Sequence, residues 1–188
     1  MAIYKEGKRL VKLWKGAEKI ARVYKGSELI FGYPPETLLF EQSTAGTYTL
    51  TLDYDVKCHI EIVGGGGGGN ILPAHDWFYG GGSGSYIKGE AVIPAGTYEI
   101  KVGGGGYTGN GGNSSFYNQI AGGGKGGNMG DNAGGTPTIT LSGLTGTNGN
   151  GGGFGYTGSS VYDGSGNYGA GALGWGTGTA GYVKIQTV

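Results

Sequence analysis

Glycine recurs at every third position in the stretch GLTGTNGNGGGFGYTG, which spans residues 143–158. The same spacing returns within residues 103–112 and 124–130. A left-handed helix of the polyproline-II type has three residues per turn and no internal hydrogen bonds, so its backbone groups must bond to neighbouring chains or water. Glycine along one face would let such helices approach closely and exchange backbone hydrogen bonds laterally. The spacing therefore predicts a bundle of polyglycine-II helices.

The high glycine content also allows other folds. The 188-residue chain has 48 glycines but only 5 prolines, too few for a collagen triple helix. A flexible linker would contain few aromatic residues, whereas this chain has 14 Tyr, 5 Phe and 3 Trp. We therefore expect a folded chain of one domain with a short extra module. Plain glycine loops on a β-sandwich remain the alternative to polyglycine-II helices.

The segments between the glycine runs have the alternation of β-strands. In residues 47–63, TYTLTLDYDVKCHIEIV, the polar and apolar side chains would face opposite ways, with a turn near Asp53–Asp55. The polar face holds Asp55, Lys57, His59 and Glu61, and the apolar face holds Val56, Cys58, Ile60 and Ile62. AGTYTLTL at 45–52 returns as AGTYEIKV at 95–102, and further strands are expected within 85–93 and 181–188. No segment predicts a stable helix, because glycine costs a helix about 1 kcal/mol per residue relative to alanine.

The first 32 residues repeat every ten positions, and the motif is an apolar residue, an aromatic residue and a lysine. The copies are Ile3-Tyr4-Lys5, Leu13-Trp14-Lys15 and Val23-Tyr24-Lys25. Pro34 and Pro35 follow and interrupt strand pairing. We expect a basic β-repeat segment at 1–32, a linker at 33–37 and a glycine-rich domain at 38–188. The fold class is all-β: short N-terminal β-meander repeats followed by a glycine-rich β-sandwich with a polyglycine-II helix bundle.

Charge is divided unevenly along the chain. Residues 1–32 hold eight Lys/Arg and three Glu, whereas residues 33–188 hold five Lys and ten Asp/Glu. Lysines that protect strand edges explain the basic end, and an acidic partner or nucleic acid that binds this end is the alternative. Phosphate binding needs clustered Lys/Arg, so we expect no nucleic-acid partner for the acidic glycine-rich domain.

The sequence offers no set of residues for catalysis. The GxGxxG in VGGGGGGN at 63–70 opens no helix, which excludes a dinucleotide site. His59 and His75 are the only histidines and lack a third ligand at metal-site spacing, and the single Cys58 is expected to be a small buried apolar residue. We therefore expect no enzyme, no cofactor and no metal. The N-terminus lacks the apolar core of a signal peptide, and no apolar run reaches the roughly 18 residues of a membrane span, so no membrane insertion is expected.

Aromatic residues inside glycine- and asparagine-rich loops are the remaining candidates for function. Tyr, Trp, Ser, Gly and Asn in loops are typical of binding surfaces, and flat aromatic faces beside amides suit sugars. We expect about half of the loop aromatics, which also include Phe116, Tyr117 and Trp175, to cap a sparse core instead. The candidate receptor-binding residues are Trp77, Phe78, Tyr79, Tyr107, Phe154, Tyr156, Tyr162 and Tyr168.

Several blocks, in their order, resemble the glycine-rich domain of bacteriophage receptor-binding and fibre proteins. They are FEQSTAGTYTLTLDYDVKCHIEIVGGGGGGN, GGGSGSYIKGEAVIPAGTYEIKVGGGG, GGNSSF, AGGGKGGNMG and GTAGYVKIQTV. The stretch KLWKGAEKIARVYKGSELIFG is similar to short YKG repeats at the start of phage structural proteins. The resemblance implies stacked polyglycine-II rods with distal loops that touch a bacterial receptor. It also implies a virion-anchoring role for the N-terminal repeats, with Tyr4, Trp14, Lys15, Tyr24 and Lys25 as the anchoring residues.

We therefore expect a phage fibre or adhesin that is made in the host cytoplasm and resides on the virion, as a tail or capsid fibre. Its expected partners are other virion structural proteins and a bacterial cell-surface glycan or outer-membrane protein. A homotrimer is the favoured assembly, and other oligomeric states stay open. The alternative is a receptor-free structural decoration protein. An ice-binding glycine-rod protein and a depolymerase are weaker hypotheses, because the chain has one cysteine and its Asp131 and Asp163 are isolated carboxylates.

Overall fold

The computed structural model describes residues 4–5, 8–9, 13–15, 18–20, 23–25, 28–72, 77–128 and 132–188; before Gly32 it describes the backbone and, of the side chains, only that of Val23. The described residues form strands and extended loops and no helix, which confirms the all-β prediction. Accordingly, this part of the chain holds no helix long and apolar enough to cross a membrane.

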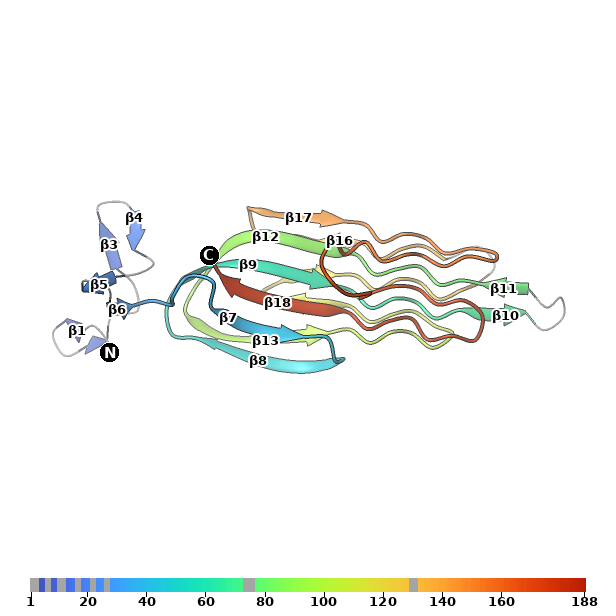
Figure 1. The fold of residues 1–188 in the computed structure, drawn as a ribbon, viewed down its shortest axis with the longest axis horizontal. Helices are drawn as coiled ribbons and strands as arrows, with labels where there is room; N and C mark the ends of the chain where they lie inside the picture. The colour runs from blue at the N-terminus through green and yellow to red at the C-terminus, as the bar shows by residue number, and fades with distance from the viewer. Residues whose placement is uncertain are drawn as a thin grey trace.

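The N-terminal repeats form three separate hairpins, one per ten-residue repeat, rather than one shared sheet. The hairpins are β1 (Tyr4–Lys5) with β2 (Lys8–Arg9), β3 (Leu13–Lys15) with β4 (Glu18–Ile20), and β5 (Val23–Lys25) with β6 (Glu28–Phe31). Figure 1 shows the hairpins at one end of the molecule, next to the C-terminus.

Two five-stranded antiparallel sheets pack face to face after the hairpins. The first sheet has the order β17 (Leu144–Thr147), β12 (Tyr86–Ile93), β9 (Val56–Val63), β18 (Tyr182–Thr187) and β7 (Leu38–Gln42). The second has the order β16 (Pro137–Thr138), β15 (Gln119–Ala121), β14 (Ser114–Phe116), β13 (Gly96–Val102) and β8 (Gly46–Leu52). Their inner faces enclose one apolar core that includes Ile60, Ile87, Ile100, Phe116 and Ile185.

Strand β9 confirms the predicted alternation, with one correction. Val56, Cys58, Ile60 and Ile62 are buried in the core, and Lys57 is exposed on the other face. Asp55 was expected on the polar face but is buried, and its Oδ1 accepts a hydrogen bond of 2.8 Å from the Ala95 N–H. The physical reason is that the strand begins only at Val56, so Asp55 precedes the strand and its carboxylate binds the backbone of the connection between β12 and β13.

The repeated AGTY motif marks two strands that pair with each other. β8 and β13 are antiparallel neighbours, with Thr51 opposite Thr97. Each motif tyrosine donates its hydroxyl to the backbone carbonyl four residues earlier, Tyr48 to Thr44 and Tyr98 to Pro94, both at 2.7 Å. The repeat in the sequence is therefore a repeat in local geometry.

Glycine-rich segments extend from the ends of these strands and form the long body seen in Figure 1. We call them the glycine bundle; its described segments are residues 64–69, 80–85, 103–112, 122–127, 132–135, 149–158 and 169–181. The first excursion leaves β9, reaches the short hairpin of β10 (Asn70–Leu72) and β11 (Trp77–Tyr79), and returns into β12. All residues of 64–69 and 80–85 are buried, so these two segments form the interior of the bundle.

Backbone hydrogen bonds in the interior of the bundle have a period of three. In residues 64–69, the N–H groups of residues i and i+3 donate to the same neighbouring segment, over 2.8–3.0 Å. Their acceptors lie, in turn, in residues 82–85, 109–112 and 176–179. Residues 80–85 do the same toward three other segments, within residues 150–153, 169–172 and 122–125. Each interior segment is therefore bonded laterally to several neighbours at once.

This period is the one that a polyglycine-II bundle requires, but none of the segments is a helix of the described structure, so the polyglycine-II helix itself stays a prediction. The 143–158 run is also not one rod. Gly143 lies in a turn with a φ of 87°, Gly146 belongs to β17, and Gly155 has a φ of 77° at the far end of the bundle. Gly149 and Gly152 before Gly155, and Gly158 after it, donate backbone hydrogen bonds to other segments of the bundle.

Candidate functional site

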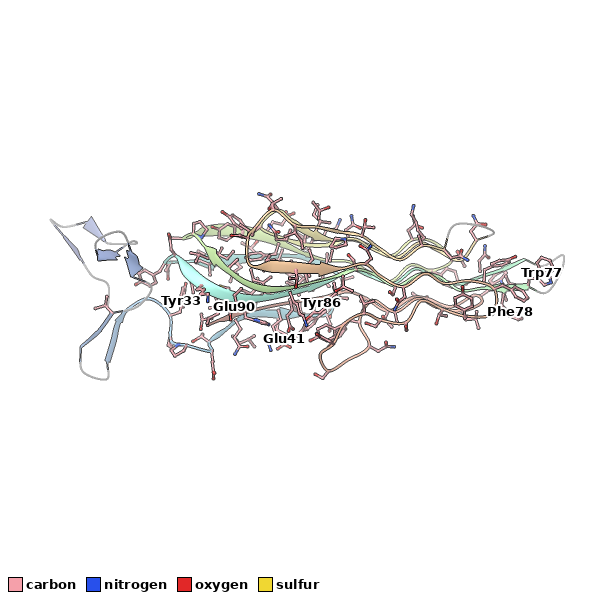
Figure 2. The ribbon with its side chains drawn as sticks, turned by 90° about the horizontal axis from the view of Figure 1, so that it is seen from above. Tyr33, Glu41, Trp77, Phe78, Tyr86 and Glu90 are labelled. Carbon is pink, nitrogen blue, oxygen red and sulfur yellow. The ribbon has the colours of Figure 1, made fainter. Side chains whose placement is uncertain are left out.

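The ends of the glycine excursions meet at one end of the molecule, which we call the tip. Its described residues are 70–72, 77–79, 107–110, 125–128, 154–156 and 173–177. Backbone contacts join them: Tyr79 bridges Phe154, Tyr107 bridges Thr177, and the Gly155 N–H donates to the Phe78 carbonyl over 2.9 Å. Figures 1 and 2 show β10, β11, Trp77 and Phe78 at the end of the molecule opposite the hairpins.

The β10–β11 hairpin positions the predicted aromatic triplet. Asn70, Ile71 and Leu72 pair with Tyr79, Phe78 and Trp77. The side chains of Trp77 and Phe78 remain 42% and 46% exposed. His75 and Asp76 lie outside the described residues.

Three of the predicted binding residues form an aromatic cluster. The Trp77 and Phe154 rings lie 5.7 Å apart, and the Tyr79 and Phe154 rings lie 5.9 Å apart, both in edge-to-face geometry. These contacts are in the favourable range for aromatic pairs. The three rings line a shallow hollow of about 130 Å³.

Phe154 of this cluster is nevertheless 60% exposed, and other tip aromatics are also largely in solvent. Tyr107 is 61% exposed, and Tyr156 and Trp175 are each 60% exposed. Trp175 was not among the predicted binding residues. It lies between Gly174 and Gly176, as Phe154 lies between Gly153 and Gly155, and this glycine-flanked setting is the signal that could have identified it.

Two predicted binding residues, Tyr162 and Tyr168, lie elsewhere. They pack on the outer face of the first sheet against Val63, Tyr86 and Tyr182. The Tyr168 and Tyr182 rings stack at 4.5 Å, and the Tyr162 hydroxyl donates to Glu61 Oε2 over 3.1 Å. Burial, with a smaller contribution from the charge of Glu61, raises the pKa of Tyr162 to about 12. These rings stabilise the loop on the sheet, and the structure does not bring them to the tip.

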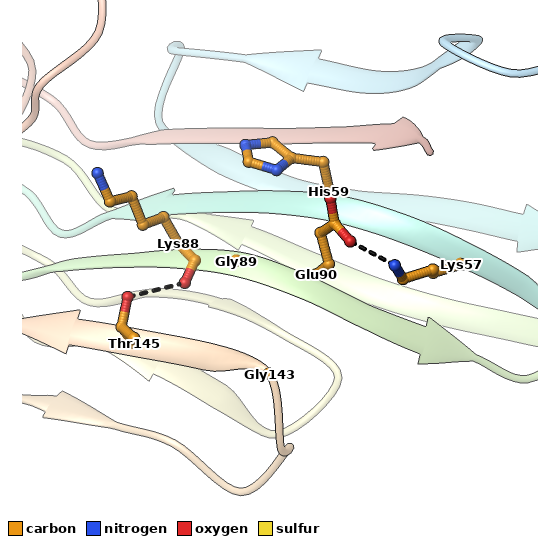
Figure 3. A pocket seen from close by; sticks show the side chains of 7 residues that line it. All are labelled: Lys57, His59, Lys88, Gly89, Glu90, Gly143 and Thr145. Carbon is orange, nitrogen blue, oxygen red and sulfur yellow. Dashed lines mark hydrogen bonds and ion pairs between the residues drawn. The ribbon is translucent and has the colours of Figure 1, made fainter.

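A wider hollow of about 670 Å³ lies on the outer face of β9, β12 and β17 (Figure 3). Its charged groups are paired: Lys57 with Glu90, and Lys88 with Asp163. The hydrogen bond from Lys57 lowers the pKa of the Glu90 carboxyl. His59 Nε2 lies 3.3 Å from Glu61 Oε1. The described residues contain no group of His, Cys, Asp and Glu that could hold a metal ion, and this hollow is a solvated charged face.

The predicted anchoring residues occupy equivalent positions in the hairpins. Tyr4 lies in β1, Trp14 and Lys15 in β3, and Tyr24 and Lys25 in β5, the first strand of each hairpin. Their side chains lie outside the described part of the structure, so the anchoring role stays a prediction.

Comparison with known protein families places most of the chain in one of them. A search of the curated proteins finds none similar to this chain. A family model described as a glycine-rich domain matches residues 42–187. The match begins at the last residue of β7 and ends at the last residue of β18, so it spans the glycine bundle and both sheets except for most of β7, and it excludes the hairpins. The chain therefore belongs to the glycine-rich domain family.

Proposed function

We propose that this protein is a non-enzymatic attachment protein of a bacteriophage particle. The N-terminal hairpins dock it to other virion proteins, and the tip binds a receptor on the bacterial surface. The observation that carries the proposal is that exposed aromatic side chains from separate excursions gather at the end opposite the hairpins. The resemblance of the sequence blocks to phage receptor-binding and fibre proteins supports the phage assignment.

The exposed aromatics favour binding over a purely structural role. An apolar side chain in water forfeits roughly 25 cal/mol for each Å² it would otherwise bury. Clustered exposed apolar surface is therefore typical of an interaction site. Tyrosine and tryptophan offer large, rigid contact area at low conformational-entropy cost, which suits a binding surface.

The glycine bundle supports the tip as a rigid platform. Its interior segments donate backbone hydrogen bonds to several neighbours, so each tip loop is held at both of its ends. Binding loops that are already ordered lose less conformational entropy on association. A stiff bundle therefore raises the affinity of the tip for its receptor.

A receptor-free decoration protein is the second candidate. The observation that favours it is the packing of Trp77, Tyr79 and Phe154 on one another, because rings that cover the end of a bundle need no ligand.

A homotrimer on the virion stays part of the proposal, and the mass of the purified protein in solution tests it.

Binding of the labelled full-length protein to a panel of bacterial strains tests the proposal by flow cytometry. We expect Phe78→Ala and Trp175→Ala to weaken binding by about tenfold or more, as for aromatic residues at the centre of an interface. Val92→Ala is the matched control, because Val92 is 51% exposed on β12, away from the tip. If no strain binds the protein, or if the tip variants bind as the control does, the receptor-free role stands instead.

A further inference from the structure

The tip contains a polar cavity beside its aromatic cluster. It has a volume of about 220 Å³ and lies between the excursions at 70, 108–110 and 125–128. Its lining combines glycine backbone with the side chains of Asn70, Thr108, Asn110, Lys125 and Asn128. Tyr107 is next in sequence to the lining residue Thr108 and is 61% exposed.

Two asparagines of this cavity are fixed with their amide nitrogens as donors. Asn70 Oδ1 accepts a hydrogen bond of 2.9 Å from the Ile71 N–H. Asn110 Oδ1 accepts one of 2.9 Å from the Gly126 N–H, which joins two excursions. Among the described residues, none accepts a hydrogen bond from Nδ2 of Asn70 or Asn110. The cavity therefore presents oriented N–H donors to a ligand that supplies acceptor oxygens.

The size and chemistry of the cavity select among ligand classes. Sites for drug-sized molecules measure about 300–1,000 Å³, so a cavity of about 220 Å³ suits a single ring-sized unit. A protein epitope instead buries about 800 Å² on each partner over a broad surface. Amide donors in the cavity, with an exposed tyrosine next in sequence to one of its lining residues, match a sugar, which has hydroxyl oxygens on its edge and an apolar face of C–H groups.

We propose that this cavity binds one neutral pyranose unit of a glycan. Its hydroxyl oxygens accept hydrogen bonds from Asn70 Nδ2 and Asn110 Nδ2, and its C–H face lies on the ring of Tyr107. The assignment of that glycan to a bacterial surface rests on the proposed attachment function, whereas sugar binding by the cavity does not.

Asparagine-to-aspartate substitutions isolate the donor role. Asn70→Asp and Asn110→Asp keep an oxygen that accepts the Ile71 or Gly126 N–H, but they replace the NH₂ donor with an acceptor. Asn113→Asp is the matched control, because Asn113 Oδ1 accepts the Gly123 N–H over the same 2.9 Å and Asn113 does not line this cavity. Tyr107→Ala is an independent second variant, since it removes the stacking ring and leaves both asparagines in place.

The probe is a printed array of neutral hexose, N-acetylhexosamine and heptose oligosaccharides, tested with the full-length protein and followed by calorimetry on the best sugar. We expect Asn70→Asp and Asn110→Asp each to weaken sugar binding by roughly three- to tenfold, the value of one hydrogen bond, and Asn113→Asp to bind as the unchanged protein does. Thermal unfolding of each variant shows whether it is folded.

The outcomes separate this inference from the proposed function. Array binding that is lost in the cavity variants supports it, even when no bacterium binds the protein and the attachment role fails. If no sugar on the array binds, or if the cavity variants match Asn113→Asp, the cavity is not a sugar site. Cell binding that resists periodate but is lost after protease treatment identifies a protein receptor; it overturns the glycan assignment and leaves the attachment role intact.

Discussion

At the scale of single residues, the glycine bundle depends on space that no side chain could occupy. A Cβ added to Gly66 would lie 1.8 Å from the Ala170 carbonyl oxygen, whereas one added to Gly104 would meet only the Ala45 Cβ at 3.5 Å. The clash at Gly66 is with backbone that itself belongs to the bundle, so no rotamer change relieves it. Glycine is therefore required at some bundle positions and replaceable at others.

We predict that Gly66→Ala destabilises the protein by about 1–3 kcal/mol or more, the range for overpacked interiors. Gly104→Ala should change the free energy of unfolding little, because its new methyl group would be in ordinary van der Waals contact. Urea denaturation of both variants measures the difference. Equal stability of the two variants would show that the segments around Gly66 are not packed as described.

Cys58 makes a second prediction at this scale. Burial raises the pKa of its thiol from 9.0 to about 12, so the unfolded chain loses this proton at lower pH than the folded protein does. The protonated thiol of Cys58 therefore contributes fully to the free energy of unfolding below pH 9. This contribution is lost as the pH rises toward 12, and the total loss is at most about 4 kcal/mol. We expect Cys58→Ala to flatten the decline in unfolding free energy over this pH range, measured by urea denaturation at each pH. If the decline is unchanged in Cys58→Ala, ionisable groups other than Cys58 cause it.

At the scale of elements, side-chain alternation predicted strands well but could not predict how glycine segments pair. β9 follows its pattern because one face is buried and the other is in solvent. Asp55 departs from that pattern because a turn, not the strand, determines where its carboxylate points. The partners of Gly64–Gly69 could not be read from the sequence, since glycine–glycine contacts carry no side-chain identity. The hydrogen bonds that select them form only when the whole bundle assembles.

The AGTY repeat gives a prediction for two paired strands. Tyr48→Phe and Tyr98→Phe each remove the hydroxyl that binds a carbonyl four residues earlier, so each should lower the free energy of unfolding by about 0.5–1.5 kcal/mol. Tyr107→Phe is the control, because this ring is 61% exposed at the tip. Thermal and urea denaturation provide the measurement. If the strand variants match the control, the repeated hydrogen bond does not contribute to stability.

At the scale of the whole molecule, the sequence predicted exposed loop aromatics but not which of them lie at the tip. Among the aromatic residues in glycine- and asparagine-rich loops, Trp77, Phe78 and Tyr156 were the ones expected to be exposed, and they are. Tyr162 and Tyr168 look similar in sequence, yet their loop folds back onto the first sheet. Which loops reach the tip depends on how far each excursion runs before it turns, and this length is fixed by lateral bonding to distant segments.

The separation of hairpins and tip predicts two independent losses of function. Under the proposed function, Trp14→Ala with Tyr24→Ala in the full chain should abolish incorporation into particles, while the free protein still binds cells. Trp175→Ala should do the reverse, because Trp175 lies at the tip, 60% exposed, and the hairpins lie at the other end. Co-sedimentation with particles and flow cytometry of the free protein measure the two activities. If either variant loses both while its thermal unfolding is unchanged, docking and attachment share a surface, and the assignment of one role to each end is wrong.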